Sequence, residues 1–268
     1  MGLTPGRRAA ALGILLAHLL GGCASDRGGP APVPPPQPPP ISIAVDEAAP
    51  VAAPVTLDCD AGLLEPWFRR RAETAEGAGT GLLAGSIEFS PVPGRSARLG
   101  ILEMQPVQRW LEEAAAAGDT DPANGLLAAI NTGGAIDLQG VVSPELGDGQ
   151  ALVLRARPQR LEFQGGVGIR YLAAFTDDYV PLTDANLFYL FEGLTRDGRR
   201  YVSLRLPLAA TALPDAPEPG TLEAAAEFAV ITDAYVDAVL ERLTLAEPAS
   251  FRPPLDRLDE FVGSIVVR

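Results

Sequence analysis

The chain has 268 residues, of which 47% are hydrophobic and 21% charged, and its formal net charge is -13. This apolar content suffices for a hydrophobic core, so the composition excludes a chain that is disordered throughout. The excess of negative charge repels phosphate backbones and anionic lipid head groups, which argues against nucleic acid as a partner. The length suits one large domain or two small ones.

Two absent residue types limit the chemistry that is available. The only histidine is His18, which lies in a segment expected to be removed, and the chain contains no lysine. A mature protein without either cannot use a Ser-His-Asp or Cys-His mechanism, bind zinc through imidazole, or form a Schiff base. We therefore expect no cofactor, and any catalysis would depend on Asp, Glu, Tyr, Ser or Arg.

The first 22 residues have the pattern of a secretory signal peptide. Arg7 and Arg8 precede an apolar stretch, Ala9 to Leu20, which is shorter than the roughly twenty residues that a membrane-spanning helix needs. The following residues, 20–23 (LGGC), resemble the lipobox of bacterial lipoproteins. That resemblance implies cleavage between Gly22 and Cys23 and a lipid on the Cys23 sulfur. The alternatives are an ordinary secretory signal with an incidental cysteine and an uncleaved anchor.

The residue after the lipobox cysteine bears on location. Ala24 stands where an aspartate would retain a lipoprotein at the inner membrane. The lipoprotein resemblance therefore implies an outer-membrane anchor facing the periplasm in a host with two membranes. In a host with one membrane, the protein would face outward from it.

A proline-rich segment follows, with the sequence PAPVPPPQPPP at residues 30–40. Such a segment forms a stiff polyproline II helix that rises by about 3.1 Å per residue. We interpret it as a spacer and not as a ligand for SH3-like or WW-like domains. The predicted organisation is a signal peptide (1–22), a lipidated cysteine with a tether (23–54) and one globular domain (55–268).

The globular part has many segments typical of β-strands. Residues 85–90 and 98–104 flank a turn of Pro and Gly and predict a hairpin. Five further segments are separated by short turns, which predicts an antiparallel meander. These segments are 152–155, 160–164, 168–175, 187–194 and 200–208. In residues 187–194 the side chains at odd and at even positions are mostly apolar, and these two sets point to opposite faces of a strand. We therefore expect this strand to be covered on both faces.

Four segments have helical spacing or composition: 107–117, 122–130, 221–245 and 255–264. The last of them is followed by a β-like end at residues 265–267. The sequence therefore predicts an α+β domain, an antiparallel meander sheet with helices packed on one face or on both, the latter giving α/β/α layers.

Residues 168–208 (GIRYLAAFTDDYVPLTDANLFYLFEGLTRDGRRYVSLRLPL) and 251–267 (FRPPLDRLDEFVGSIVV) are similar to a group of secreted bacterial proteins of unknown function. The upstream hairpin fits the same group. The order of hairpin, sheet and terminal helix also resembles PsbP-like domains, which implies α/β/α layers by analogy. Neither resemblance implies an active site.

One loop groups several oxygen-bearing side chains. Asp177, Asp178, Asp184 and Asn186 lie within ten residues, and calcium takes six to eight oxygen ligands. The spacing is not that of an EF-hand, and Asp and Asn are also common turn residues. We interpret the group as turn and cap residues, with Asp177, Asp178 and Asp184 as the weak metal candidates.

Carboxylates also allow glycoside hydrolysis, which needs an acid and base pair. Glu162, Glu192 and the loop aspartates are the candidates. Sugar-cleaving clefts usually expose aromatic side chains, whereas the only tryptophans, Trp67 and Trp110, lie in apolar or helical contexts.

Two further features have simpler interpretations than a functional one. The glycines at residues 165, 166 and 168 lie between two predicted strands, whereas a phosphate-binding loop would precede a helix. Cys59 lies between Asp58 and Asp60, and neighbouring negative charge disfavours a reactive thiolate. We predict that Cys59 is a buried small residue, with an intermolecular disulfide as the alternative.

Two functional hypotheses remain. The favoured one is a lipid-anchored envelope protein that is not an enzyme and that binds a protein or small ligand or has an assembly role. The other is a carboxylate-dependent hydrolase that acts on an envelope glycan or another extracellular substrate.

Overall fold

The computed structural model describes ten parts of the chain. They are residues 56–65, 67–74, 83–90, 97–103, 128–131, 136, 138, 151–176, 181–213 and 222–268. All lie in the second of the two units into which the chain divides, Pro40–Arg268. The predicted signal peptide, Cys23, the tether and the predicted helix at 107–117 lie outside the described residues.

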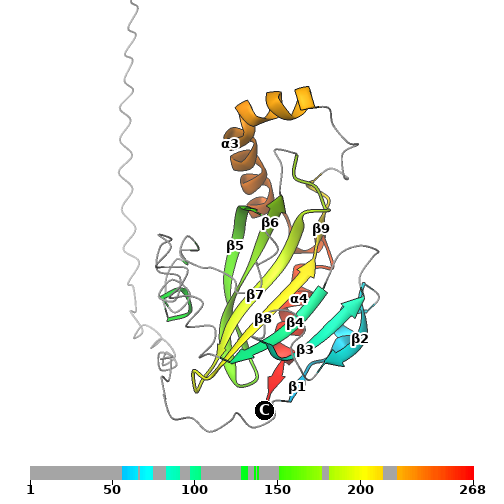
Figure 1. Ribbon diagram of the computed structural model, residues 1–268, viewed down its shortest axis with the longest axis vertical. Helices are drawn as coiled ribbons and strands as arrows, with labels where there is room; N and C mark the ends of the chain where they lie inside the picture. Colours follow the sequence, from blue (N-terminus) through cyan, green and yellow to red (C-terminus); the bar gives the residue numbers. More distant parts are fainter. Residues whose placement is uncertain are drawn as a thin grey trace, which may run out of the picture. The chain divides into compact units, whose positions relative to one another are not determined.

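Strands dominate the described chain, and the secondary-structure elements follow one another in the order shown in Figure 1. They are β1 (Leu57–Asp58), η1 (Ala61–Leu64), β2 (Arg69–Thr74), β3 (Leu83–Ser90), β4 (Ala97–Glu103), β5 (Ala151–Phe163), β6 (Gly166–Thr176), β7 (Leu187–Thr195), β8 (Arg200–Pro207), β9 (Ala209–Ala210), α3 (Leu222–Leu245), η2 (Pro248–Ser250), β10 (Phe251–Arg252), α4 (Leu255–Ser264) and β11 (Val266–Val267).

Seven strands form one antiparallel sheet in the order β2-β3-β4-β8-β7-β6-β5. The predicted hairpin is confirmed as β3 and β4, and the predicted meander is confirmed as β5 to β8. The hairpin joins the meander at β8, so that Arg98 of β4 lies opposite Arg205 of β8. The α+β class predicted from the sequence is therefore correct.

The first meander strand differs from the prediction. Residues 152–155 and 160–164 were expected as two strands separated at Pro158, whereas β5 is a single strand of 13 residues. Its register against β6 shifts between Ala156 and Gln159, and Arg157 there has a φ of 52°. Proline lacks an N–H to donate, so it is tolerated in a sheet at a bulge of an edge strand. Because β5 is the edge strand, the chain continues through Pro158 without ending the strand.

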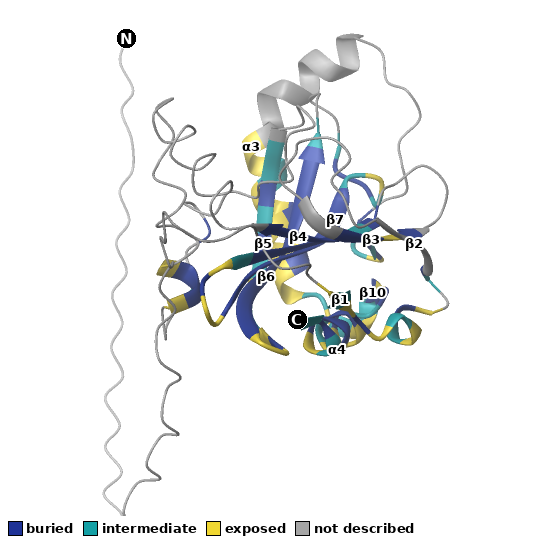
Figure 2. Ribbon diagram, turned by 60° about the horizontal axis from the view of Figure 1, so that its bottom comes forward, coloured by how far each residue is buried: buried dark blue, intermediate teal, exposed yellow. Residues whose placement is uncertain are grey.

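The sheet is covered on both faces. All nine residues of β7 are buried, as predicted for a strand with cover on both sides. Helices α3 and α4 pack on what we call the first face, where their side chains join Leu172, Tyr189 and Leu204 in one core. Figure 2 shows the buried strands with α4 along one side of them. On the second face, Ala129 and Ile130 of a short helical stretch pack with Ile169, Tyr171 and Leu190.

The C-terminal segment is an integral part of the domain. Helix α4 buries Leu255, Leu258, Phe261 and Val262 against the first face, as its helical spacing predicted. Strand β11 then pairs with β1, and Thr56 and Arg268 exchange two backbone hydrogen bonds of 2.9 and 3.0 Å. The two ends of the described chain are therefore held together.

Helix α3 is attached to the first face by its C-terminal half. Val239 and Leu243 are buried, and the Tyr235 hydroxyl bonds the backbone N–H and C=O of Leu182 at 2.9 and 3.2 Å. None of the described helices combines the length and apolarity needed to cross a bilayer.

Candidate functional site

The oxygen-rich loop does not form a metal site in the residues that the structure describes. Asp177 and Asp178 lie outside them. Asp184 is described, and its Oδ1 accepts a hydrogen bond of 2.8 Å from the backbone N–H of Ala210. This contact joins the loop before β7 to β9. Within the described chain, no three His, Cys, Asp or Glu side chains lie close enough to hold a metal ion.

Asn186 closes the turn before β7. Its Oδ1 accepts hydrogen bonds from the Thr183 backbone N–H at 2.7 Å and from the Thr183 hydroxyl at 3.3 Å. The Thr183 hydroxyl oxygen in turn accepts from the Ala185 N–H at 3.1 Å. These are the side-chain to backbone bonds that stabilise turns. The turn interpretation therefore fits both residues of this loop whose contacts are described, Asp184 and Asn186.

The two glutamates proposed as an acid and base pair occupy different environments. The Glu162 side chain is 60% exposed and its carboxylate lies 3.5 Å from the Arg196 guanidinium. Glu192 is 0% exposed on the second face, opposite Ser203. They lie two strands apart and two residues out of register, which places their Cα atoms about 12 Å apart at usual sheet spacings. The two carboxylates do not share a solvent-filled cleft.

The glycines between β5 and β6 serve the sheet. Gly165 has a φ of 101° in the turn, a conformation that favours glycine. At Gly168 an added Cβ would lie 2.4 Å from the carbonyl oxygen of Glu192. Strand β6 follows directly, so the turn interpretation is confirmed.

Cys59 is 9% exposed and packs into the core on the first face, beside Leu64 and Phe68. Its burial fits the predicted role as a small buried residue.

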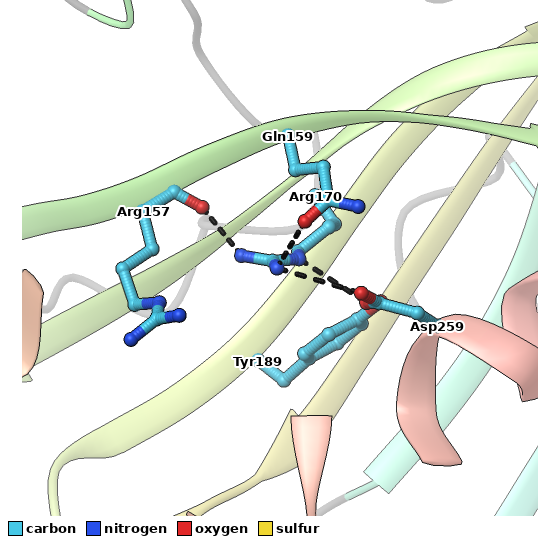
Figure 3. Close-up of polar contacts among 5 residues, drawn as sticks. All are labelled: Arg157, Gln159, Arg170, Tyr189 and Asp259. Atoms are coloured by element: carbon cyan, nitrogen blue, oxygen red, sulfur yellow. Dashed lines mark hydrogen bonds and ion pairs between the residues drawn. The ribbon is translucent and has the colours of Figure 1, made fainter. Parts of the chain in front are cut away.

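Among the residues that the structure describes, the most extensive buried polar network connects α4 to the sheet (Figure 3). Arg170 of β6 donates from Nε to Asp259 Oδ1 at 3.1 Å and from Nη2 to Asp259 Oδ2 at 3.4 Å. Its remaining bonds go to the Gln159 side chain and to the Arg157 carbonyl, each at 2.5 Å. The Tyr189 hydroxyl donates to Asp259 Oδ1 at 2.8 Å. Every group in this network is used in joining α4, β5, β6 and β7.

Arg157 extends the same network to α3. Its guanidinium donates to the carbonyls of Leu243 and Thr244 at 3.3 and 3.4 Å and also to that of Ala246. A cation is stabilised at a helix C-terminus, where carbonyls lack partners within the helix. The bulge in β5 thus places one arginine as the cap of α3. No sequence pattern indicated this role, because the contact spans more than 80 residues.

A second group of polar side chains lies on the second face. Burial raises the pKa of the Tyr171 hydroxyl, the negative charge of Glu192 raises it further, and the positive charge of Arg155 opposes them. Strand register places these three residues on the same face of the neighbouring strands β5, β6 and β7. On the same face, the Arg205 guanidinium lies 4.2 Å from the ring centroid of Phe188 and 5.1 Å from that of Phe175. Only Glu192 among these residues was a candidate in the sequence.

The two tyrosines at the sheet centre differ in their hydroxyl contacts. Tyr189 on the first face donates to Asp259, as described above. Tyr171 on the second face is also 0% exposed, yet its hydroxyl makes no hydrogen bond to the described residues. Buried polar groups are usually hydrogen-bonded, and exceptions occur at functional sites.

A scan of the chain against protein-family models found no match, and searches of curated proteins and of solved structures found no significant similarity.

Proposed function

We propose that this protein is a lipid-anchored envelope protein that acts outside the cytoplasm by binding or assembly and not by catalysis. Three features of the N-terminus support attachment of a lipid: the basic start, the apolar segment of residues 9–20 and the lipobox-like residues ending at Cys23. The proline-rich segment then separates the anchor from a domain whose described part begins at Thr56. Its partners are the membrane, through the lipid, and an envelope protein or small ligand.

One observation carries the non-catalytic part of the proposal. Among the described candidate carboxylates, one serves the fold, one is exposed on the surface and one is sealed from solvent. Asp184 bonds the backbone of β9, and Glu162 is paired on the surface. Glu192 is enclosed at 0% exposure. A glycosidase needs two carboxyl groups about 5 to 9.5 Å apart around its substrate, and Glu162 and Glu192, which lie two strands apart, do not supply that pair.

The anchor is tested by Cys23→Ser in the full chain. We expect the variant to move from the detergent phase to the soluble fraction, or to stay unprocessed, and to lack the mass of acyl chains. Cys59→Ser is the matched control, because Cys59 is buried in the domain and should not affect lipidation. Unchanged detergent partitioning of Cys23→Ser would contradict the proposal.

The absence of catalysis is tested with envelope glycans as substrates. We expect no turnover by the wild-type protein above that of a heat-denatured sample. Glu192→Gln and Glu162→Gln would be compared if turnover appears, with circular dichroism as the check on folding. Turnover that one of these substitutions abolishes without unfolding the domain would favour the hydrolase.

A further inference from the structure

Helix α3 exposes apolar side chains on the side that does not face the sheet. In the part of the chain that the structure describes, the exposed large apolar residues are Leu240 and Leu245, at 36% and 74%. Both belong to the C-terminal half of α3, whose exposed residues are yellow in Figure 2. Leu245 contributes little to the core in this position, because hydrophobic stabilisation follows the apolar area removed from water.

Helical geometry places Leu245 in line with three carboxylates. Asp233, Asp237, Glu241 and Leu245 recur every four residues and are all exposed; we call them the outer row. Val239, which is buried in the core on the first face, lies two positions from both Asp237 and Glu241. Two positions along an α-helix correspond to about 200°, so the outer row points away from the sheet. At 1.5 Å per residue, the row extends for about 18 Å along the helix.

The carboxylates of the outer row do not stabilise the described fold. None of the three makes a hydrogen bond or an ion pair within the described residues. Asp237 lies four residues from both Asp233 and Glu241, and like charges at this spacing destabilise a helix. Arg242, the one basic residue in the sequence of α3, lies about 100° around the helix from Glu241. Cationic side chains of a partner would therefore relieve a repulsion that α3 itself does not.

The charge of the outer row indicates what kind of molecule covers it. A second copy packed face to face would bring the same carboxylates against the first, and an anionic membrane would be repelled in the same way. Two long segments outside the described residues are acidic as well. Residues 104–127 contain one arginine and four carboxylates, and residues 139–150 contain two carboxylates and no basic residue. Charge complementarity therefore favours a basic segment of another protein.

We propose that the outer row, with the neighbouring Leu240, is the docking surface for a basic amphipathic helix of another envelope protein. Basic side chains at every fourth position of that helix meet the three carboxylates, and its apolar side chains cover Leu240 and Leu245. The inference rests on the proposed binding role and gives it a class of partner.

The experiment uses a synthetic helical peptide as the probe. The peptide has lysine at every fourth position, one leucine on each side of the lysine row, alanine elsewhere and blocked ends. The control peptide has glutamate in place of lysine. The full lipidated chain is placed in phosphatidylcholine nanodiscs, with empty nanodiscs as the blank, and calorimetric titration measures binding. We expect the lysine peptide to bind, more weakly as the salt concentration rises, and the glutamate peptide not to bind.

Substitutions in the outer row test whether the peptide binds there. Asp237→Asn and Glu241→Gln should each weaken binding by about two- to fivefold, as expected for exposed ion pairs. Leu245→Ser should weaken it by about tenfold, as expected for the loss of a leucine that binding buries. Asp256→Asn, at an exposed carboxylate on α4, is the matched control and should bind like the wild type. Because all four side chains are exposed, the urea midpoints of the free variants should not fall below that of the wild type by more than about 0.2 M.

Several outcomes would overturn the inference. One is the absence of binding by the lysine peptide, and another is an equal effect of Asp256→Asn and Glu241→Gln, since binding would then follow net charge alone. A dimer that Leu245→Ser dissociates would assign the surface to a second copy. Binding to phosphatidylglycerol vesicles that Leu245→Ser abolishes would assign it to a membrane. None of these results changes the outcome of the Cys23→Ser fractionation, so the two proposals fail separately.

Discussion

Removal of the Asp259 side chain should destabilise the domain more than any other single change on α4 that leaves the apolar core intact. Asp259→Ala leaves the Arg170 guanidinium without its carboxylate at a side chain that is 5% exposed. It also removes the acceptor of the Tyr189 hydroxyl, which is fully buried. Water cannot readily solvate a buried charge that has lost its partner. The loss therefore raises the free energy of the folded state and leaves the unfolded state unchanged.

The expected magnitude follows from these contacts. Breaking a buried ion pair by removing one partner typically costs about 3–5 kcal/mol. Asp259 is 18% exposed, which admits some water to Arg170 and favours the lower end, about 3 kcal/mol. Because a domain is stable by about 5–15 kcal/mol, the variant should lose a fifth of its stability at the least. Urea unfolding followed by circular dichroism measures this loss as a lower midpoint at an unchanged slope.

Two further variants make the measurement specific. Glu260→Ala removes an exposed carboxylate on the same helix, paired with Arg257 at 2.8 Å, and should cost under about 1 kcal/mol. Arg170→Met in the Asp259→Ala background removes the unpaired charge and should restore part of the loss. Equal losses in Asp259→Ala and Glu260→Ala would refute the view that burial of this pair stabilises α4.

Three more predictions concern close packing, pH and the C-terminus. Gly168→Ala should cost about 2–3 kcal/mol, because its Cβ would lie 2.4 Å from the Glu192 carbonyl oxygen; a urea midpoint equal to that of the wild type would contradict this. Burial raises the pKa of Tyr171 and Tyr189. The contribution of these two tyrosines to stability should therefore be constant below about pH 10. Above that pH it should fall by about 1.4 kcal/mol per pH unit and tyrosine, since only the unfolded chain ionises there. Urea midpoints between pH 8 and 11 measure this fall, which should be smaller when both are phenylalanine. Deletion after Pro254 removes five side chains that are 0% exposed, and burial of each stabilises the domain by about 1.5–3 kcal/mol. The truncated protein should aggregate or melt far below the parent. An unchanged melting temperature would show that α4 is an appendage.

The sequence by itself determined the local elements, because their side-chain periods are visible within a few residues. Leu255, Leu258, Phe261 and Val262 recur at helical spacing, and the structure has a helix with the predicted bounds at this position. Both alternating sets of residues 187–194 are apolar, and β7 is buried on both faces. These patterns show whether an element is buried on one side or on both. Such burial depends on whether the residues are apolar and much less on which residues pack against them.

Only the tertiary structure decided which distant residues meet. Arg170 and Asp259 lie 89 residues apart, and nothing in either local pattern indicates the other. Pro158 looked like the end of a strand, yet β5 continues through it, because an edge strand with a bulge does not need the missing N–H. The contact of β4 with β8 likewise places Arg98 opposite Arg205. Register and strand order depend on packing of the whole sheet, so the buried network of Arg170, Asp259 and Tyr189 became visible only in three dimensions.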